Sequence, residues 1–88
     1  MKLKEGFVLT KVGDNYVAVQ VGDAPDKLHG LIRLNETGAF IWRGLEEGLD
    51  EALIAERMVA EYAGVDLELA KKAVNDIVGK LANDGLLE

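Results

Sequence analysis

The sequence has no cysteine, one proline and one histidine, and these scarcities exclude several kinds of site. Without cysteine the chain can hold neither a disulfide framework nor a thiolate metal site. A single histidine, His29, leaves few partners for a catalytic triad or a metal centre. There is no run of about 18 apolar residues, which a membrane span needs, and residues 1–5 do not resemble a signal peptide. We therefore expect a cytoplasmic protein with no metal site and no membrane segment.

The sequence also lacks the usual patterns of an enzyme. Gly44 and Gly48 stand without the preceding strand and the lysine that a phosphate-binding loop requires. The acidic pairs at 46–47 and 50–51 fall at predicted helix ends, where solvated carboxylates are commoner than metal ligands. No pair of ionisable groups in an apolar segment suggests general acid–base catalysis. We expect a protein that is not an enzyme, with no catalytic residue and no cofactor.

The length and composition of the chain indicate one folded domain with an uneven distribution of charge. The 88 residues correspond to one domain, residues 1–88, and 49% of them are hydrophobic, which is enough for a core. The net charge of −6 is unevenly spread. Residues 1–34 hold five basic and four acidic groups, whereas residues 35–88 hold five basic and twelve acidic groups. The second part argues against nucleic acid as a partner, because phosphate binding needs clustered Lys and Arg.

One stretch predicts a strand that runs directly into a helix. Ile32 and Leu34 share one face of an extended segment, and Asn35 is a favourable N-cap for the turn that follows. Gly38 removes a side chain from the first helical turn, so another group can pack closely there. Trp42 is the only tryptophan and lies among apolar residues at helical spacing. We predict that its side chain is buried in the core.

Three strands are predicted before this helix. Alternating apolar residues indicate strands at 6–12 and 16–21, joined by turn residues at 13–15. A loop at 22–29 contains the only proline, and a short third strand follows at 30–34. We predict an antiparallel sheet in which the first two strands form a hairpin.

Three helices are predicted after the sheet. The first spans residues 36–45, and Gly44 and Gly48 are expected to end it. The second begins after the N-cap Asp50. Its buried stripe is predicted to consist of Ile54, Met58 and Tyr62.

The third helix is predicted to begin after the N-cap Asp66 and to stop at Gly85, with Leu86 and Leu87 as an apolar anchor. Gly79 lies inside it, and we interpret this glycine as a tolerated defect rather than a point of close approach. The predicted core face consists of Leu67, Ala70, Val74, Ile77, Val78 and Leu81. The whole order predicts an α+β fold, a three-stranded antiparallel sheet followed by three helices.

The remaining candidate for a functional site is a binding surface at the edge of the predicted sheet. If the strand at 30–34 lies at the edge of the sheet, its free N–H and C=O groups can pair with an added strand. The third helix would then form the other wall of a groove. The alternative is an edge that is merely exposed, or covered by the protein's own loop.

Several of these residues resemble the PqqD family. The resemblance is carried by residues 34–39, LNETGA, followed by Ile41 and Trp42. The stripe of the second helix and the apolar ending at 74–87 also fit, so that the resemblance covers about residues 5–88.

This chain departs from the family pattern at three positions. Asp50 stands where members often have Thr, which also caps helices. Ala73 and Ile77 stand where members often have Asp and a nearby Phe. Changes in the third helix could alter which peptide is bound, so the resemblance does not name a pathway.

The resemblance implies a winged helix-turn-helix-like domain that recognises ribosomally made peptides. The leader of a precursor peptide would pair with the third strand, in a cleft beside the third helix. The domain would act as a stand-alone peptide chaperone that docks onto a modifying enzyme, typically a radical enzyme that uses S-adenosylmethionine. In the namesake pathway the product is pyrroloquinoline quinone.

The expected peptide-binding residues follow from this resemblance together with the helical spacing. They are Gly30, Leu31, Ile32, Arg33, Leu34, Lys71, Asn75 and Val78. The other side of the third helix, with Ala73, Asp76 and Lys80, is the alternative groove wall. Lys71 and Arg33 could attract acidic leader residues or could simply be solvated.

The sequence leaves two rival functions open. A winged-helix nucleic-acid binder needs a basic recognition helix, whereas the third helix carries three Lys against four acidic residues. An oligomerisation module, such as a homodimer that swaps an element through the loop at 22–29, could coexist with peptide binding. The sequence does not identify the precursor peptide, the partner enzyme or the product.

Overall fold

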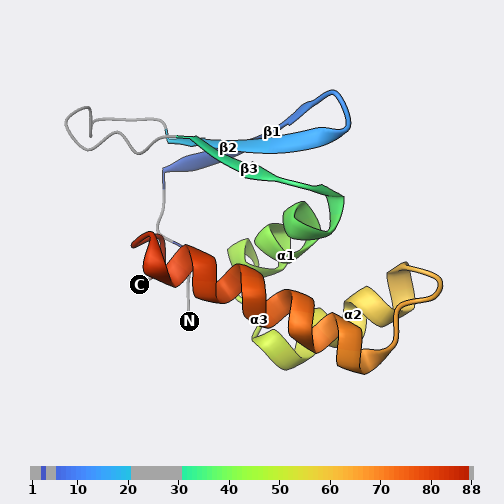
Figure 1. Cartoon of the computed structure of the whole chain (residues 1–88). Coiled ribbons are helices and arrows are strands. Elements are labelled where there is room, and N and C mark those ends of the chain that lie inside the picture. The colour runs from blue at the N-terminus through green and yellow to red at the C-terminus, as the bar shows by residue number, and fades with distance from the viewer. Residues whose placement is uncertain (1–2, 4–5, 21–30, 88) are drawn as a thin grey trace.

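The computed structural model describes residue 3, residues 6–20 and residues 31–87. The predicted fold class is confirmed, since three antiparallel strands precede three helices (Figure 1). The elements are β1 (Phe7–Val12), β2 (Asn15–Gln20), β3 (Leu31–Leu34), α1 (Glu36–Glu46), α2 (Glu51–Glu61) and α3 (Leu67–Asn83). The loop predicted at 22–29, together with Val21 and Gly30, lies outside the described residues.

The molecule has a sheet layer and a helix layer (Figure 1). The strand order is β1-β2-β3, so both β1 and β3 are edge strands of the described sheet. All three helices lie on one face of the sheet, and α1 joins the two layers because it packs on β2 and β3 as well as on α2 and α3. None of the described helices combines the length and the apolar character that crossing a membrane requires.

A two-residue turn connects β1 to β2. Val12 pairs with Asn15, so only Gly13 and Asp14 lie outside the strands. Gly13 has φ of 64°, and Asp14 has a negative φ, which is the arrangement of a type II′ turn. Asn15 was expected in the turn but begins β2, because this turn type needs glycine at its first central position and only two residues in all.

The three helix starts are capped as predicted. The side-chain oxygens of Asn35, Asp50 and Asp66 each accept a hydrogen bond of 2.8 Å from the backbone N–H three residues further on. Such a cap satisfies one of the N–H groups that the first helical turn leaves without a partner. The caps therefore fix where each helix begins after its strand or loop.

Trp42 lies at the centre of the core with no exposed surface, as predicted. The Phe7 ring from β1 meets it edge to face, with 5.7 Å between the ring centres. Its indole Nε1 is buried and has no hydrogen-bond partner among the described residues. The residues buried around it from the sheet and helices include Ala18, Ile32, Leu34, Ile41, Leu45, Ile54, Met58, Val74 and Leu81.

The two ends of the chain meet beside this core. Leu86 is buried and follows Gly85, whose φ of 78° ends α3 in a left-handed conformation. Leu87 forms an isolated antiparallel bridge with Leu3, which is itself buried. The predicted apolar anchor after α3 is confirmed.

Three helix predictions need correction or refinement. Leu67 is 42% exposed, because it lies in the first turn of α3, beyond the region where the helices are packed. Ile77 is half-buried at the margin of the core. Gly44 does not end α1 but lies inside it, at the point where α1 touches α2. A Cβ at Gly44 would come within 2.8 Å of the Ile54 Cγ1 atom, so the glycine permits this close contact.

Gly44→Ala and Gly79→Ala are expected to change stability in opposite directions. The first should destabilise the fold by ~1–3 kcal/mol, because α1 and α2 must separate to admit the methyl group. At Gly79 an added Cβ meets no described atom within 4 Å, so alanine should stabilise the helix by up to ~1 kcal/mol. Urea unfolding midpoints measure both effects. Equal midpoints for the two variants would contradict the close contact at Gly44.

Candidate functional site

The register of the sheet decides which backbone groups of β3 are free. In a two-residue hairpin the closing pair, here Val12 and Asn15, is hydrogen-bonded, and hydrogen-bonded pairs alternate with non-bonded pairs along the ladder. Asn15, Val17 and Val19 therefore direct their N–H and C=O groups to β1. The intervening residues of β2 direct theirs to β3.

The same alternation continues into β3. Tyr16 pairs with Leu34 and Ala18 pairs with Ile32, so these β3 residues use their N–H and C=O groups on β2. The groups of Leu31 and Arg33 point the other way, out of the sheet. Among the described residues no backbone hydrogen bond from outside the sheet reaches them. The edge of β3 thus presents two donors and two acceptors for a further strand.

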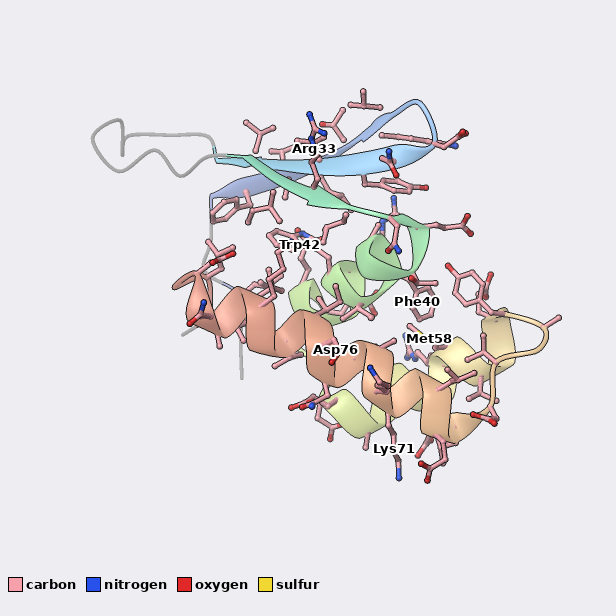
Figure 2. The ribbon with its side chains drawn as sticks, in the orientation of Figure 1. Arg33, Phe40, Trp42, Met58, Lys71 and Asp76 are labelled. Carbon is pink, nitrogen blue, oxygen red and sulfur yellow. The ribbon has the colours of Figure 1, made fainter. Side chains whose placement is uncertain are left out.

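Side chains on β3 separate the two faces of the sheet. Ile32 and Leu34 share one face of β3, as predicted, and this face turns toward the helices, where the two residues are 7% and 4% exposed. Arg33 is exposed on the opposite face, away from the helices (Figure 2). Leu31 is described in its backbone, which lies in β3, and Gly30 lies outside the described residues.

The junction between β3 and α1 holds this edge in place. A single residue, Asn35, separates the strand from the helix, and its Oδ1 atom accepts hydrogen bonds from the Gly38 N–H and the Thr37 hydroxyl. A Cβ at Gly38 would lie 3.2 Å from the Leu34 Cδ2 atom, which confirms the predicted close packing. The end of β3 is therefore fixed against the first turn of α1.

The predicted residues of α3, Lys71, Asn75 and Val78, lie within about 60° of one another around the helix but have different surroundings. Val78 is buried in the core. Lys71 and Asn75 line an open hollow of about 570 Å³ between α3 and the beginning of α2, together with Glu51 and Ala52. Figure 2 shows Lys71 pointing away from the sheet. Lys71 and Asn75 are thus not brought together with β3.

The alternative side of α3 lies on the helix opposite Lys71, which points away from the sheet in Figure 2. Ala73, Ile77 and Lys80 lie roughly 120–180° around the helix from Lys71 at the α-helical pitch. Ala73 and Ile77 are half-buried against the core, and Lys80 is exposed. In Figure 1 α3 and β3 both lie toward the viewer, and β1 lies behind. Asp76, also considered for this side, forms an exposed ion pair of 3.2 Å with Lys72.

A second hollow, of about 480 Å³, lies between α1 and α2. Its walls include Phe40, Ile54 and the exposed ion pair between Arg57 and Glu47, whose atoms are 3.5 Å apart. Phe40 packs edge to face on Tyr62, with 5.5 Å between ring centres. Sequence reasoning missed this hollow, because Gly44, one of the residues that line it, was interpreted as a helix end.

Tyr62 is the residue in this region whose ionisation is altered by its surroundings. Burial raises the pKa of its hydroxyl, and the nearby carboxylates of Glu36 and Glu61 raise it further. The hydroxyl is therefore protonated and neutral at neutral pH. It contributes packing and a hydrogen-bond donor, not a reactive phenolate.

Three antiparallel strands and three helices define a small winged helix-turn-helix-like domain, in which no further strand pairs with the outer edge of β3 among the described residues. The chain belongs to the PqqD family, because the family profile described as coenzyme PQQ synthesis protein D matches residues 16–87. The match includes the junction between β3 and α1, on which the resemblance in the sequence depended.

Two solved structures are similar to the whole chain. One is TbiB1 in complex with the TbiA(beta) leader peptide, with 30% sequence identity, a TM-score of 0.77, and coverage of 100% of this chain and 95% of that chain. The other is a lasso peptide synthetase B1 complexed with the leader peptide. It has 21% identity, a TM-score of 0.75, and coverage of 99% and 95%, and it shares the fold. A comparison with curated proteins gives no match.

Asn35→Ala is expected to destabilise the protein by ~1 kcal/mol, because the first turn of α1 loses its cap. Asn35→Asp is the matched control, since its carboxylate accepts the same hydrogen bond and should leave stability nearly unchanged. Thermal unfolding followed by circular dichroism measures both. An unchanged midpoint for the alanine variant would show that the cap does not hold the junction.

Proposed function

We propose that this chain captures the leader of a ribosomally synthesised precursor peptide by pairing it with β3 as a fourth strand. The observation that carries the proposal is the outward direction of the Leu31 and Arg33 backbone groups, which have no partner among the described residues. Antiparallel pairing is favoured, because it is slightly more stable per residue than parallel pairing and continues the pattern of this sheet. Membership of the PqqD family and the 30% identical leader-bound TbiB1 support leader binding by this chain.

The second wall of the proposed groove is the side of α3 that carries Ala73, Ile77 and Lys80. An added strand would direct every second side chain toward the helix layer, where Ala73 and Ile77 are half-buried and can be covered further. Ala73 and Ile77 are also the α3 positions at which this chain departs from the family pattern. We therefore expect that Ala73 and Ile77 influence which peptide this chain binds.

The role we propose is presentation rather than catalysis. The captured precursor would be held for a modifying enzyme that binds the same complex. Its assignment as a radical enzyme using S-adenosylmethionine rests on the family resemblance. Co-purification of the tagged chain with the enzyme encoded beside it tests that assignment, and recovery of an enzyme of another class would replace it.

Amide chemical shifts test the location of the groove. When the leader of the precursor encoded beside this chain is added to the ¹⁵N-labelled protein, the largest shifts are expected at Leu31–Leu34 and on the Ala73, Ile77 and Lys80 side of α3. Lys71 and Asn75 should shift less, because they lie at the hollow beside α2. Shifts confined to the β1–β2 hairpin or to α2 would refute strand addition at β3.

Arg33→Pro is expected to weaken leader binding at least ~tenfold while the domain stays folded. Proline removes an N–H group that points out of the sheet and places its ring where the added strand would approach, and an edge strand tolerates proline at such a position. Arg33→Ala is the matched control, because it removes the side chain and keeps the N–H group. Isothermal titration calorimetry with the same leader measures both variants. Equal affinities for the proline and alanine variants would contradict backbone pairing at Arg33.

A further inference from the structure

Arg33 is the last in a row of three cross-strand neighbours on the outer face of the sheet, and the other two are uncharged. The row runs from Thr10 on β1 through Val17 on β2 to Arg33 on β3, as the register of the two strand pairs requires. No carboxylate occupies this row, and neither of the two ion pairs among the described residues includes Arg33. The Arg33 cation therefore lies beside the strand position that the proposed peptide would fill.

The register also fixes what lies opposite Arg33 in an added antiparallel strand. Residues directly opposite each other in a ladder have side chains on the same face of the sheet. The peptide residue that pairs with Arg33 would therefore have its side chain beside the guanidinium group. Its two neighbours in the peptide would lie opposite Ile32 and Leu34 and point toward the helices.

The two faces of the peptide would meet different chemistry. On the helix side Ile32 and Leu34 are nearly buried, and Ala73 and Ile77 of α3 are half-buried, so apolar peptide side chains are favoured. On the outer side the neighbours are Arg33 and, one strand further, Val17. Opposite charges across a ladder stabilise the pair, and like charges oppose it.

We infer, on the basis of the proposed strand addition, that this chain selects peptides in which an acidic residue pairs with Arg33 and is flanked on both sides by apolar residues. The net charge of −6 does not prevent this selection, although it would repel an acidic peptide at long range. At physiological ionic strength exposed charges more than about 8 Å apart are largely screened, so the adjacent guanidinium dominates.

The test uses a displayed library of short linear peptides with every position random, selected in parallel on three proteins. They are the unchanged chain, Arg33→Glu and Arg57→Glu. Arg57→Glu is the matched control, because it makes the same change of net charge at the hollow between α1 and α2, where Arg57 pairs with Glu47. Circular dichroism first confirms that the three proteins have the same helix content and similar unfolding midpoints.

The unchanged chain and Arg57→Glu are expected to enrich the pattern apolar–acidic–apolar, and Arg33→Glu is expected to enrich apolar–basic–apolar. A double-mutant cycle then measures the pair directly, with one enriched peptide synthesised in its Glu and Lys forms. The matched combinations should bind about two- to fivefold more tightly than the mismatched ones, as cross-strand charge pairs typically do. Arg33→Gln should bind the two peptides with nearly equal affinity.

Amide chemical shifts of the labelled protein, measured with an enriched peptide added, distinguish a failure of charge selection by Arg33 from a failure of strand addition at β3. If the shifts fall on Leu31–Leu34 but Arg33→Glu does not reverse the preferred charge, the selection by Arg33 is wrong and strand addition stands. If no peptide is enriched, or the enriched peptides bind elsewhere on the protein, strand addition fails and the selection fails with it.

Discussion

The two-residue turn at Gly13–Asp14 fixes the hydrogen-bonding pattern on which the rest of the sheet depends. Because bonded and non-bonded pairs alternate, the closing pair of this hairpin determines which β2 residues serve β1 and which serve β3. That choice leaves Leu31 and Arg33 with outward backbone groups. A one-residue change in this turn would shift the register between β1 and β2, and one of these two strands would then turn its side chains to the other face of the sheet.

The helix layer holds β3 in the position that this pattern requires. Asn35 caps α1 one residue after the strand, and the glycine at 38 allows Leu34 to pack against the first helical turn. Further along α1, Trp42 fills the space under the sheet, and Gly44 admits Ile54 of α2. The outer edge of β3 is thus attached to a core of closely packed residues. An added strand would therefore bind a preformed edge, and binding would not have to offset the cost of ordering β3.

The sequence predicts the elements well because their signals are local. Alternation defines the strands, and the caps at Asn35, Asp50 and Asp66 define the helix starts. The surroundings of each side of α3 could not be predicted in this way. Helical spacing gives the angle between Lys71 and Ile77, but which neighbour lies at each angle depends on how α3 crosses α1 and α2. For the same reason Gly44 was interpreted as a helix end, since the contact with Ile54 joins residues of different helices.

The small size of the open edge limits what the backbone can contribute to binding. Two outward residues offer four hydrogen bonds, and at ~0.5–1.5 kcal/mol each they contribute about 2–6 kcal/mol. Micromolar affinity corresponds to about 8 kcal/mol, and binding must also offset the loss of freedom of the peptide. The remainder has to come from side chains, chiefly apolar groups that cover the half-buried Ala73 and Ile77. In the proposed complex, affinity and selectivity would therefore depend on α3 as well as on β3, although the backbone of β3 would determine where the peptide lies.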